Sequence, residues 1–404
     1  MADYPQSVEE VQDRVRQAAM SYSSLAPQGG GTQLHIGFPP SRPVVPLPLT
    51  KLDALVEYTP EDLVVIAQAG MTLGRLQAIL AEKNQWLPLE IARPDQQTLG
   101  GIVASRANSI LRGGYGSVRD WLIGLDAVGA DGEIVKGGGK VVKNVSGYDL
   151  PKLYCGSWGT LGVVTQVAFK VAARPDAACT LLAVLGADRN SEEALDTLLG
   201  VLTPAFTLLF NAEAAREILG DDAAPAQYLA LRFSGVREAV EESAHRAVDI
   251  LSPYSASVLA LSPEVGEKLG KALRDFPLAD APLAARHNVL SSQVGAFVRM
   301  IDWTAEKAGL KSRVMADALT GVVYAQYHPN DPGAFDWNSA YPAIKDKADR
   351  VGGSFVIERM PDPWRESGIP VWSPELPDWK LMEQIKKAFD PKGIFNPGRF
   401  VVGA

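Results

Sequence analysis

Residues 97–120 read QTLGGIVASRANSILRGGYGSVRD, and they open a stretch that is unusually rich in glycine. Of the 37 glycines in the chain, 15 lie between Thr98 and Gly162. Glycine accepts positive φ angles and lets a ligand approach the main chain closely. The cluster therefore predicts main chain wrapped around a large ligand. A loop-rich β-meander is the alternative that this composition leaves open.

The sequence around the cluster alternates between strand and helix patterns. Apolar runs and a turn at Ala130-Asp131-Gly132 predict strands at residues 63–68, 121–128, 133–135 and 163–171. Thr72 is expected to cap a helix whose apolar face contains Leu73, Leu76, Ile79 and Leu80. A domain boundary is expected near residue 175, where Ala172-Ala173-Arg174-Pro175 ends the last strand.

The rest of the chain predicts a second domain and a C-terminal segment. From residue 176 onward, helices rich in Ala and Leu, such as 237–251, alternate with short strands, as in an α+β domain. A proline-rich connector follows, and then a helix over 379–389 with Leu381, Ile385 and Phe389 on its apolar face. We therefore expect domains at 1–175 and 176–375 and a terminal segment at 376–404.

Composition and charge exclude several classes of protein. The 404 residues carry a net charge of −8 without a basic cluster, so a nucleic-acid footprint is absent. Cys155 and Cys179 cannot form a disulfide framework, and the four histidines lack the spacing of metal ligands, so no metal site is expected. The charged N-terminal segment reads as a surface helix. Two cysteines without a disulfide framework fit a cytoplasmic protein. No apolar run reaches membrane-spanning length, so any membrane association is expected to be peripheral and through partners.

Two segments have the composition of phosphate-binding main chain. In Pro27-Gln28-Gly29-Gly30-Gly31-Thr32-Gln33, successive amides can form a concave anion site, although a flexible surface turn has the same composition. Residues 97–105 can begin a helix with free N–H groups, and 112–120 predict a tight bend followed by a strand. Neither a Walker loop nor a Rossmann fingerprint is present.

The ordered set GGGT, TLGG, GGYGSVRD, KNVSGYDL and GSWGTLGVVT resembles the PCMH-type FAD-binding domain of the vanillyl-alcohol oxidase family. Residues 143–162 and the terminal FDPKGIFNPGRF are also similar to the FAD-binding E subunits of bacterial glycolate oxidases. The resemblance implies an α+β fold with a two-lobed FAD-binding domain, an α+β cap domain and a tail that returns to the FAD domain.

The resemblance also assigns residues to the cofactor. It implies that residues 29–33 hold the pyrophosphate and that a second set meets the diphosphate and ribityl region. A third set would meet the adenosine half or its supporting turn, two valines would lie on the adenine side, and two tail residues would approach the flavin ring. In that order the residues are Gly29, Gly30, Gly31, Thr32, Gln33; Thr98, Gly100, Gly101, Ser105; Gly116, Ser117, Asp120; Val163, Val164; Asn396 and Arg399.

Covalent flavoproteins of this family often carry a histidine directly after the glycines of the pyrophosphate loop. Thr32 occupies that place here, so the resemblance implies noncovalent FAD. His35, three residues further on, is expected to be structural.

Catalytic residues are harder to assign. Related 2-hydroxy-acid dehydrogenases carry HxGDGNxH in the cap, whereas residues 321–328 read GVVYAQYH. Arg286-His287 and Tyr327-His328 are the histidine candidates. Glu358 and Arg359 offer a carboxylate and a guanidinium for the flavin ring, with exposed ion pairing as the alternative. We take Arg359, Glu358 and His328 as the catalytic candidates.

The resemblance implies a subunit that oxidises glycolate or D-lactate to the 2-oxo acid with FAD. It further implies a homologous FAD subunit and an iron–sulfur subunit that receives the electrons. Two alternatives stay open: a non-catalytic flavin-binding or scaffold subunit beside a homologous catalytic chain, and a stand-alone FAD oxidoreductase such as a flavin reductase or sugar oxidase.

Overall fold

The computed structural model describes residues 4–140, 148–185, 191–333, 335–342, 344–345, 351–362, 364, 369–375 and 377–400. Contacts within the chain divide it into two compact units. The first comprises Met1–Ser109, Gly116–Arg174 and Glu375–Ala404, and the second comprises Ile110–Tyr115 and Pro175–Pro374. The C-terminal segment thus returns to the first unit, as the resemblance implies.

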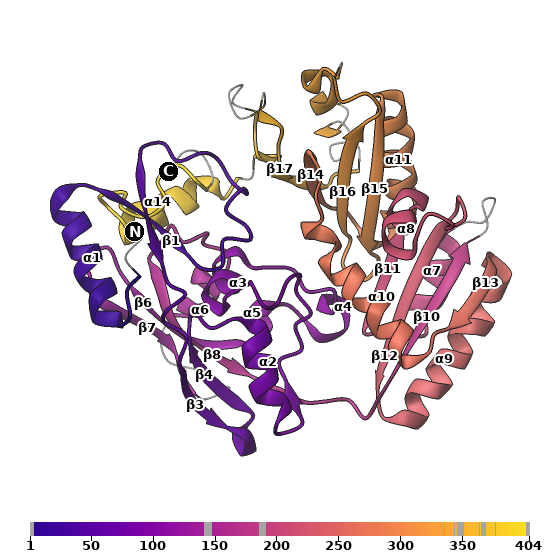
Figure 1. The fold of residues 1–404 in the computed structure, drawn as a ribbon, viewed down its shortest axis with the longest axis horizontal. Coiled ribbons are helices and arrows are strands. Elements are labelled where there is room, and N and C mark those ends of the chain that lie inside the picture. Colours follow the sequence, from indigo (N-terminus) through magenta and orange to yellow (C-terminus); the bar gives the residue numbers. More distant parts are fainter. Residues whose placement is uncertain are drawn as a thin grey trace. The chain divides into compact units, whose positions relative to one another are not determined.

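An antiparallel five-stranded sheet forms the centre of the first unit (Figure 1). Its order is β3 (Leu55–Thr59), β4 (Val64–Gln68), β8 (Val163–Lys170), β6 (Leu122–Val128) and β7 (Ile134–Gly138). The central strand β8 is buried along most of its length, which explains its nearly continuous apolar sequence. The predicted strands and the hairpin between β6 and β7 are confirmed.

Helices and two small sheets complete this unit. The short strands β5 (Gln85–Trp86) and β9 (Ala172–Ala173) pair with each other, and β1 (Ser24–Gln28) and β2 (Val44–Pro48) pair in parallel. The remaining elements are α1 (Val8–Ser21), α2 (Leu73–Ala81), α3 (Leu99–Ser105), α5 (Val118–Trp121), α6 (Leu150–Tyr154) and α14 (Trp379–Phe389). Thr72 caps α2 by accepting from the Arg75 amide, as predicted.

Two local predictions were wrong, one for residues 112–120 and one for the helix α14. Residues 112–120 do not form a simple bend before a strand, because two short helices, α4 (Arg112–Tyr115) and α5, precede β6. In α14, Leu381 is 57% exposed, whereas Ile385 and Phe389 pack against the core. A spacing of four residues drifts by about 40° per step around a helix, which turns Leu381 away from the contact.

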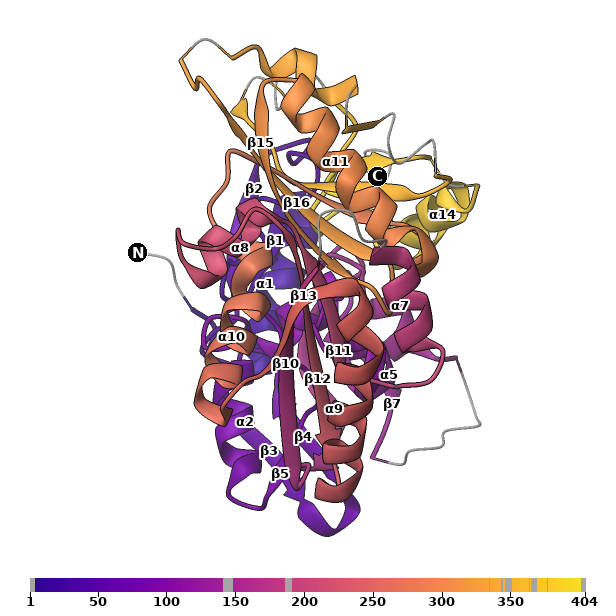
Figure 2. The ribbon, with the colours of Figure 1, turned by 90° about the vertical axis from the view of Figure 1, so that its right-hand side faces the viewer.

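A nine-stranded antiparallel sheet forms the second unit, in the order β13-β10-β12-β11-β15-β16-β14-β17-β18. Figure 2 shows α9 and α10 on opposite sides of β10 and β12. The strands are β10 (Ala177–Leu185), β11 (Phe206–Phe210), β12 (Gln227–Gly235), β13 (Ser255–Ala260), β14 (Leu283–Asn288), β15 (Leu310–Asp317), β16 (Val322–Pro329), β17 (Ser354–Arg359) and β18 (Trp372–Ser373). The helices besides α4 include α7 (Ser191–Leu199), α8 (Ala212–Leu219), α9 (Arg237–Leu251), α10 (Pro263–Asp275) and α11 (Val294–Lys307).

The short helix α4 belongs to this second unit although its neighbours in sequence belong to the first. Glycine lets it approach the sheet closely, because a Cβ at Gly114 would lie 2.8 Å from the Ala205 Cα. Within the described part of the chain, no helix has the length and apolar character needed to cross a membrane.

Candidate functional site

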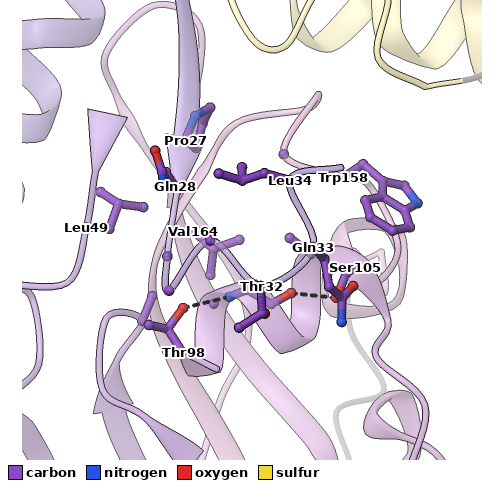
Figure 3. A pocket seen from close by; sticks show the side chains of 18 of the residues that line it. Pro27, Gln28, Thr32, Gln33, Leu34, Leu49, Thr98, Ser105, Trp158 and Val164 are labelled. Carbon is purple, nitrogen blue, oxygen red and sulfur yellow. Dashed lines mark hydrogen bonds between the residues drawn. The ribbon is translucent and has the colours of Figure 1, made fainter. Parts of the chain in front are cut away.

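A pocket in the first unit is bordered by three loops, the start of α3 and the C-terminal segment. The space inside it, part of which is open to solvent, is about 750 Å³. Figure 3 shows Leu49 and Trp158 on opposite sides of the labelled residues. The lining residues are Pro27, Gln28, Gly29, Gly30, Gly31, Thr32, Gln33, Leu34, Leu49, Ala69, Gln97, Thr98, Gly100, Gly101, Ala104, Ser105, Trp158, Gly159, Gly162, Val164 and Arg399.

The loop 29–33 packs so tightly that side chains are excluded at its first two positions. A Cβ at Gly29 would lie 2.0 Å from the Thr98 Oγ1, and a Cβ at Gly30 would lie 1.6 Å from the Gln96 carbonyl oxygen. Both contacts are far shorter than any real Cβ contact. Glycine is therefore required at Gly30 by the main chain of Gln96, and at Gly29 the neighbour is the Thr98 side chain.

The same loop presents free main-chain donors. The amides of residues 29–33 donate no hydrogen bond to any residue that the structure describes. Gly31 has φ +76°, the left-handed conformation that turns successive amides toward one side. Five consecutive unpaired amides beside a pocket are suited to hold phosphate oxygens.

The start of α3 forms the second wall. The Thr98 hydroxyl accepts a hydrogen bond from the Gly101 amide at 3.3 Å, and the Ser105 hydroxyl donates to the Gly101 carbonyl at 2.8 Å (Figure 3). A Cβ at Gly100 would lie 2.7 Å from the Ala69 Cβ, so this glycine lets α3 pack closely against the segment that contains Ala69. The predicted helix start is confirmed, with its N-terminal end at the pocket. Its N–H groups are not free as expected, because the amides of Leu99 and Gly100 each donate to a carbonyl, of Met71 and Ala69, at 2.8 Å.

A third loop was not assigned to the cofactor from the sequence, although it lies within the GSWGTLGVVT motif. Gly156, Trp158 and Gly159 all have left-handed φ angles, of +93°, +55° and +67°. The Trp158 amide donates to the Ala104 carbonyl at 2.8 Å, which fixes the loop against α3. The repeated glycines of the motif are the signal that would have identified Trp158, Gly159 and Gly162 as lining residues.

The C-terminal segment holds this third loop through its carbonyls. Asn396 donates to the carbonyls of Trp158 at 3.0 Å and Gly159 at 3.3 Å. Lys386 donates to the next carbonyl, that of Thr160, at 2.8 Å and is paired with buried Asp390. Burial lowers the pKa of Lys386, and the Asp390 carboxylate opposes that change. Three successive carbonyls are thus fixed from the tail.

Arg399 joins the tail to the glycine loop. Its guanidinium donates to the carbonyl of Gln33 at 2.9 Å and to that of Ile36 at 3.3 Å, and it lies 5.7 Å from the centre of the Trp158 ring. Burial lowers the pKa of Arg399. It supplies the only full charge among the described residues that line the pocket, and that charge is positive. Unpaired amides and one arginine fit an anionic dinucleotide.

The pocket brings together most of the residues assigned to the cofactor. Those lining it are Gly29, Gly30, Gly31, Thr32, Gln33, Thr98, Gly100, Gly101, Ser105, Val164 and Arg399. Those outside its lining are Gly116, Ser117, Asp120, Val163 and Asn396. The Ser117 amide and hydroxyl each donate to the Asp120 carboxylate at 2.7 Å, which closes a capping box at α5. The motif residues 143–147 lie outside the described residues.

The three catalytic candidates all lie in the second unit. Glu358 accepts a hydrogen bond from Arg286 at 2.7 Å, whereas Arg359 pairs with the fully exposed Asp280. Neighbouring Glu358 and Arg359 thus have different partners. The Nε2 of His328 is buried and has no hydrogen-bond partner among the described residues, and burial lowers the pKa of this imidazole.

His287 is a core residue, so its interpretation as a candidate active-site histidine is wrong. The side chain is fully buried, and its ring lies 5.2 Å from that of Phe297 and 5.9 Å from that of Phe355. Burial lowers its pKa to about 3. In the described part of the chain, no group of His, Cys, Asp and Glu side chains is arranged to hold a metal ion, and Cys155 and Cys179 are free thiols.

Comparisons with known families agree with this geometry. Residues 1–138 match the family described as FAD binding domain, and residues 374–400 match FAD linked oxidases, C-terminal domain. Glycolate oxidase subunit GlcD of Bacillus subtilis (strain 168) is 28% identical over 93% of this chain and 83% of its own length. Glycolate oxidase subunit GlcE of Escherichia coli (strain K12) is 31% identical over 56% of this chain and 67% of its own length.

A solved structure confirms the fold. The chain is similar to p-cresol methylhydroxylase with substrate bound, with a TM-score of 0.74 and 16% identity over 98% of this chain and 87% of that one. The predicted α+β fold, with a two-lobed FAD-binding domain, a cap domain and a returning tail, is confirmed. The prediction of FAD as the cofactor is also confirmed.

Proposed function

Because this chain belongs to the FAD-linked oxidase family that includes the glycolate oxidase subunits, we propose that it oxidises a small 2-hydroxy acid. We take glycolate or D-lactate as the substrate and the corresponding 2-oxo acid as the product. The observation that carries the cofactor part of the proposal is the run of unpaired amides at residues 29–33 beside Arg399.

The residues of the pocket divide the work of holding noncovalent FAD. The amides of 29–33 would hold the pyrophosphate beside the N-terminal end of α3, and Arg399 would add positive charge. Val164 would contact an apolar part of the cofactor. Gly116, Ser117, Asp120, Val163 and Asn396 would act behind this surface by fixing the turns that carry it. Thr32 offers no nucleophilic ring nitrogen, which supports noncovalent binding.

When bound in this pocket, FAD would supply the acceptor for the hydride that leaves the α-carbon of the substrate. The protein must then take the hydroxyl proton, so that a carbonyl forms, and must hold the substrate carboxylate. His328 is suited to accept the proton because its lowered pKa keeps the imidazole neutral near pH 7. Glu358 is the second candidate base, and the candidate cations are Arg359 and Arg286, which donates to Glu358.

Anaerobic flavin reduction tests the proposal. The purified chain is saturated with FAD and mixed with glycolate, D-lactate or L-lactate, and the visible absorbance of the flavin is followed. We expect bleaching with at least one of these acids and none with a polyol or NADPH. Bleaching only with NADPH or a polyol would instead support the flavin reductase or sugar oxidase alternative.

A non-catalytic flavin-binding subunit is the second candidate. It is favoured by β16, where Tyr324 and Gln326 stand in the segment in which related dehydrogenases have their histidine motif. This candidate predicts a yellow protein whose flavin no 2-hydroxy acid reduces until a homologous catalytic chain is added. Reduction of the isolated chain would contradict it.

We further propose that a homologous FAD subunit and an iron–sulfur subunit assemble with the chain in the cytoplasm, where the complex can associate peripherally with the membrane. The proposal is supported by the similarity to two glycolate oxidase subunits. Affinity purification at native expression should recover both partners. Recovery of the chain by itself would contradict this assembly.

A further inference from the structure

Alternate residues of β14 face opposite sides of the second sheet. His287 points toward α11, where it contacts Phe297. Arg286 therefore points to the other side, where it lies opposite Tyr324 of β16 and Val356 of β17. The face that carries Arg286 is thus the one that α11 does not cover.

Arg286 is a largely buried cation with most of its donors unused. Its side chain is 19% exposed, and its single hydrogen bond runs from Nε to Glu358, whose side chain is 13% exposed. The terminal nitrogens Nη1 and Nη2 donate to no residue that the structure describes. Burial lowers the pKa of Arg286, but Glu358 and Tyr324 reverse that effect and the net pKa is raised. The guanidinium therefore stays charged.

The orientation of the Arg286 guanidinium suits its Nη1 and Nη2 atoms to bind a carboxylate. The bond from Nε to Glu358 fixes the plane of the guanidinium, so Nη1 and Nη2 remain parallel and available. This edge matches the two oxygens of a carboxylate. A buried cation with unused donors is costly unless an anion or water meets them. The arrangement thus combines a positive charge with a fixed orientation.

We propose that Arg286 binds the carboxylate of a small organic acid through Nη1 and Nη2, with Glu358 as its positioning residue. The inference rests on the proposed function in taking the ligand to be the 2-hydroxy acid or its 2-oxo product. It gives Glu358 a role in orienting the cation. Arg359, whose partner Asp280 is fully exposed, is then dispensable for holding the acid.

Oxalate binding to the FAD-loaded chain tests this site by calorimetry, because oxalate has the carboxylate but no α-hydrogen. Arg286→Gln should weaken binding roughly tenfold to hundredfold, as expected for loss of a two-bond ionic contact. The matched control is Arg299→Gln, which removes another Arg–Glu pair, with Glu192 at 2.6 Å, from α11. This control should bind oxalate like the wild type.

A conservative variant separates binding from folding. Arg286→Lys keeps a charge beside Glu358 but loses the forked donors, so it should unfold at the wild-type temperature and still bind oxalate several times more weakly. Wild-type oxalate binding by Arg286→Lys and Arg286→Gln would overturn the proposal, as would an equal loss in Arg299→Gln. A loss in Arg359→Gln with none in Arg286→Gln would also overturn it.

The two proposals can fail separately. If a 2-hydroxy acid reduces the flavin but oxalate binding does not depend on Arg286, the site is wrong and the function stands. If no 2-hydroxy acid reduces the flavin but oxalate binding does depend on Arg286, the function is wrong and the carboxylate site stands.

Discussion

The pocket of the first unit is built mainly from main chain, whereas the polar face of the second sheet is built from long side chains. In the first unit, residues 29–33 supply amides without side chains, and Asn396 fixes a neighbouring loop through its carbonyls. In the second, Arg286 and Glu358 come from strands 72 residues apart in sequence. A glycine substitution should therefore be most damaging in the first unit, and a change of charge or polarity in the second.

Gly30→Val should have the largest effect. The Cβ at this position would lie 1.6 Å from the Gln96 carbonyl oxygen, so the loop must move and its amides lose their alignment. We expect complete loss of FAD during purification, measured by flavin absorbance, with a retained circular dichroism spectrum. Gly139→Ala is the control, because a Cβ there meets nothing within 4 Å. Normal FAD content in Gly30→Val would show that the glycine loop tolerates a side chain and that FAD binding does not depend on its main chain.

Lys386→Met should have the second-largest effect. It leaves the Asp390 carboxylate buried without its cation and releases the Thr160 carbonyl. Breaking a buried pair in this way costs about 3–5 kcal/mol, which urea unfolding of the FAD-loaded chain would measure. The adjacent exposed Lys387→Met is the control and should change stability little. Equal stabilities of the two variants would show that the tail does not support the pocket.

His287→Leu probes the core of the second unit. In the unfolded chain this histidine gains a proton as the pH falls below about 6.5, whereas the folded pKa is about 3. The unfolded state therefore binds more protons between these values, and stability falls with decreasing pH. We therefore compare the free energy of unfolding of the variant with that of the wild type at each pH. This difference should shift in favour of the variant by about 2–3 kcal/mol between pH 7 and pH 4.5.

Urea titrations at the two pH values measure this difference. The exposed His245→Leu on α9 is the control and should leave the pH dependence of stability unchanged. An identical pH dependence in wild type and His287→Leu would mean that His287 does not stay neutral in the folded core.

Arg399→Gln should have the smallest effect. The amide can keep one of the bonds to the carbonyls of Gln33 and Ile36, but the positive charge at the pocket is lost. We expect the FAD dissociation constant to rise roughly tenfold, measured by quenching of flavin fluorescence, and more so at low salt. An unchanged constant would mean that the main-chain amides provide the binding without this charge.

Local sequence predicted the elements that depend on neighbouring residues. The Thr72 cap, the hairpin between β6 and β7, and the strand β8 follow from turn chemistry and apolar periodicity within short windows. The glycine loop at 29–33 was identified in the same way. The exposed Leu381 was not predicted, because residues spaced by four drift around the helix and only the packing shows which of them meet the core.

By itself, the sequence determined where the chain can bend sharply and approach other main chain, since the glycines at 29–31 and within 98–162 accept φ angles that other residues avoid. Only the tertiary structure decided what those bends contact. It brought Asn396 and Arg399 to loops more than 200 residues away and Arg286 to Glu358 across the second sheet. Backbone conformation is set by a few adjacent residues, whereas the partner of a long charged side chain depends on how distant strands pair.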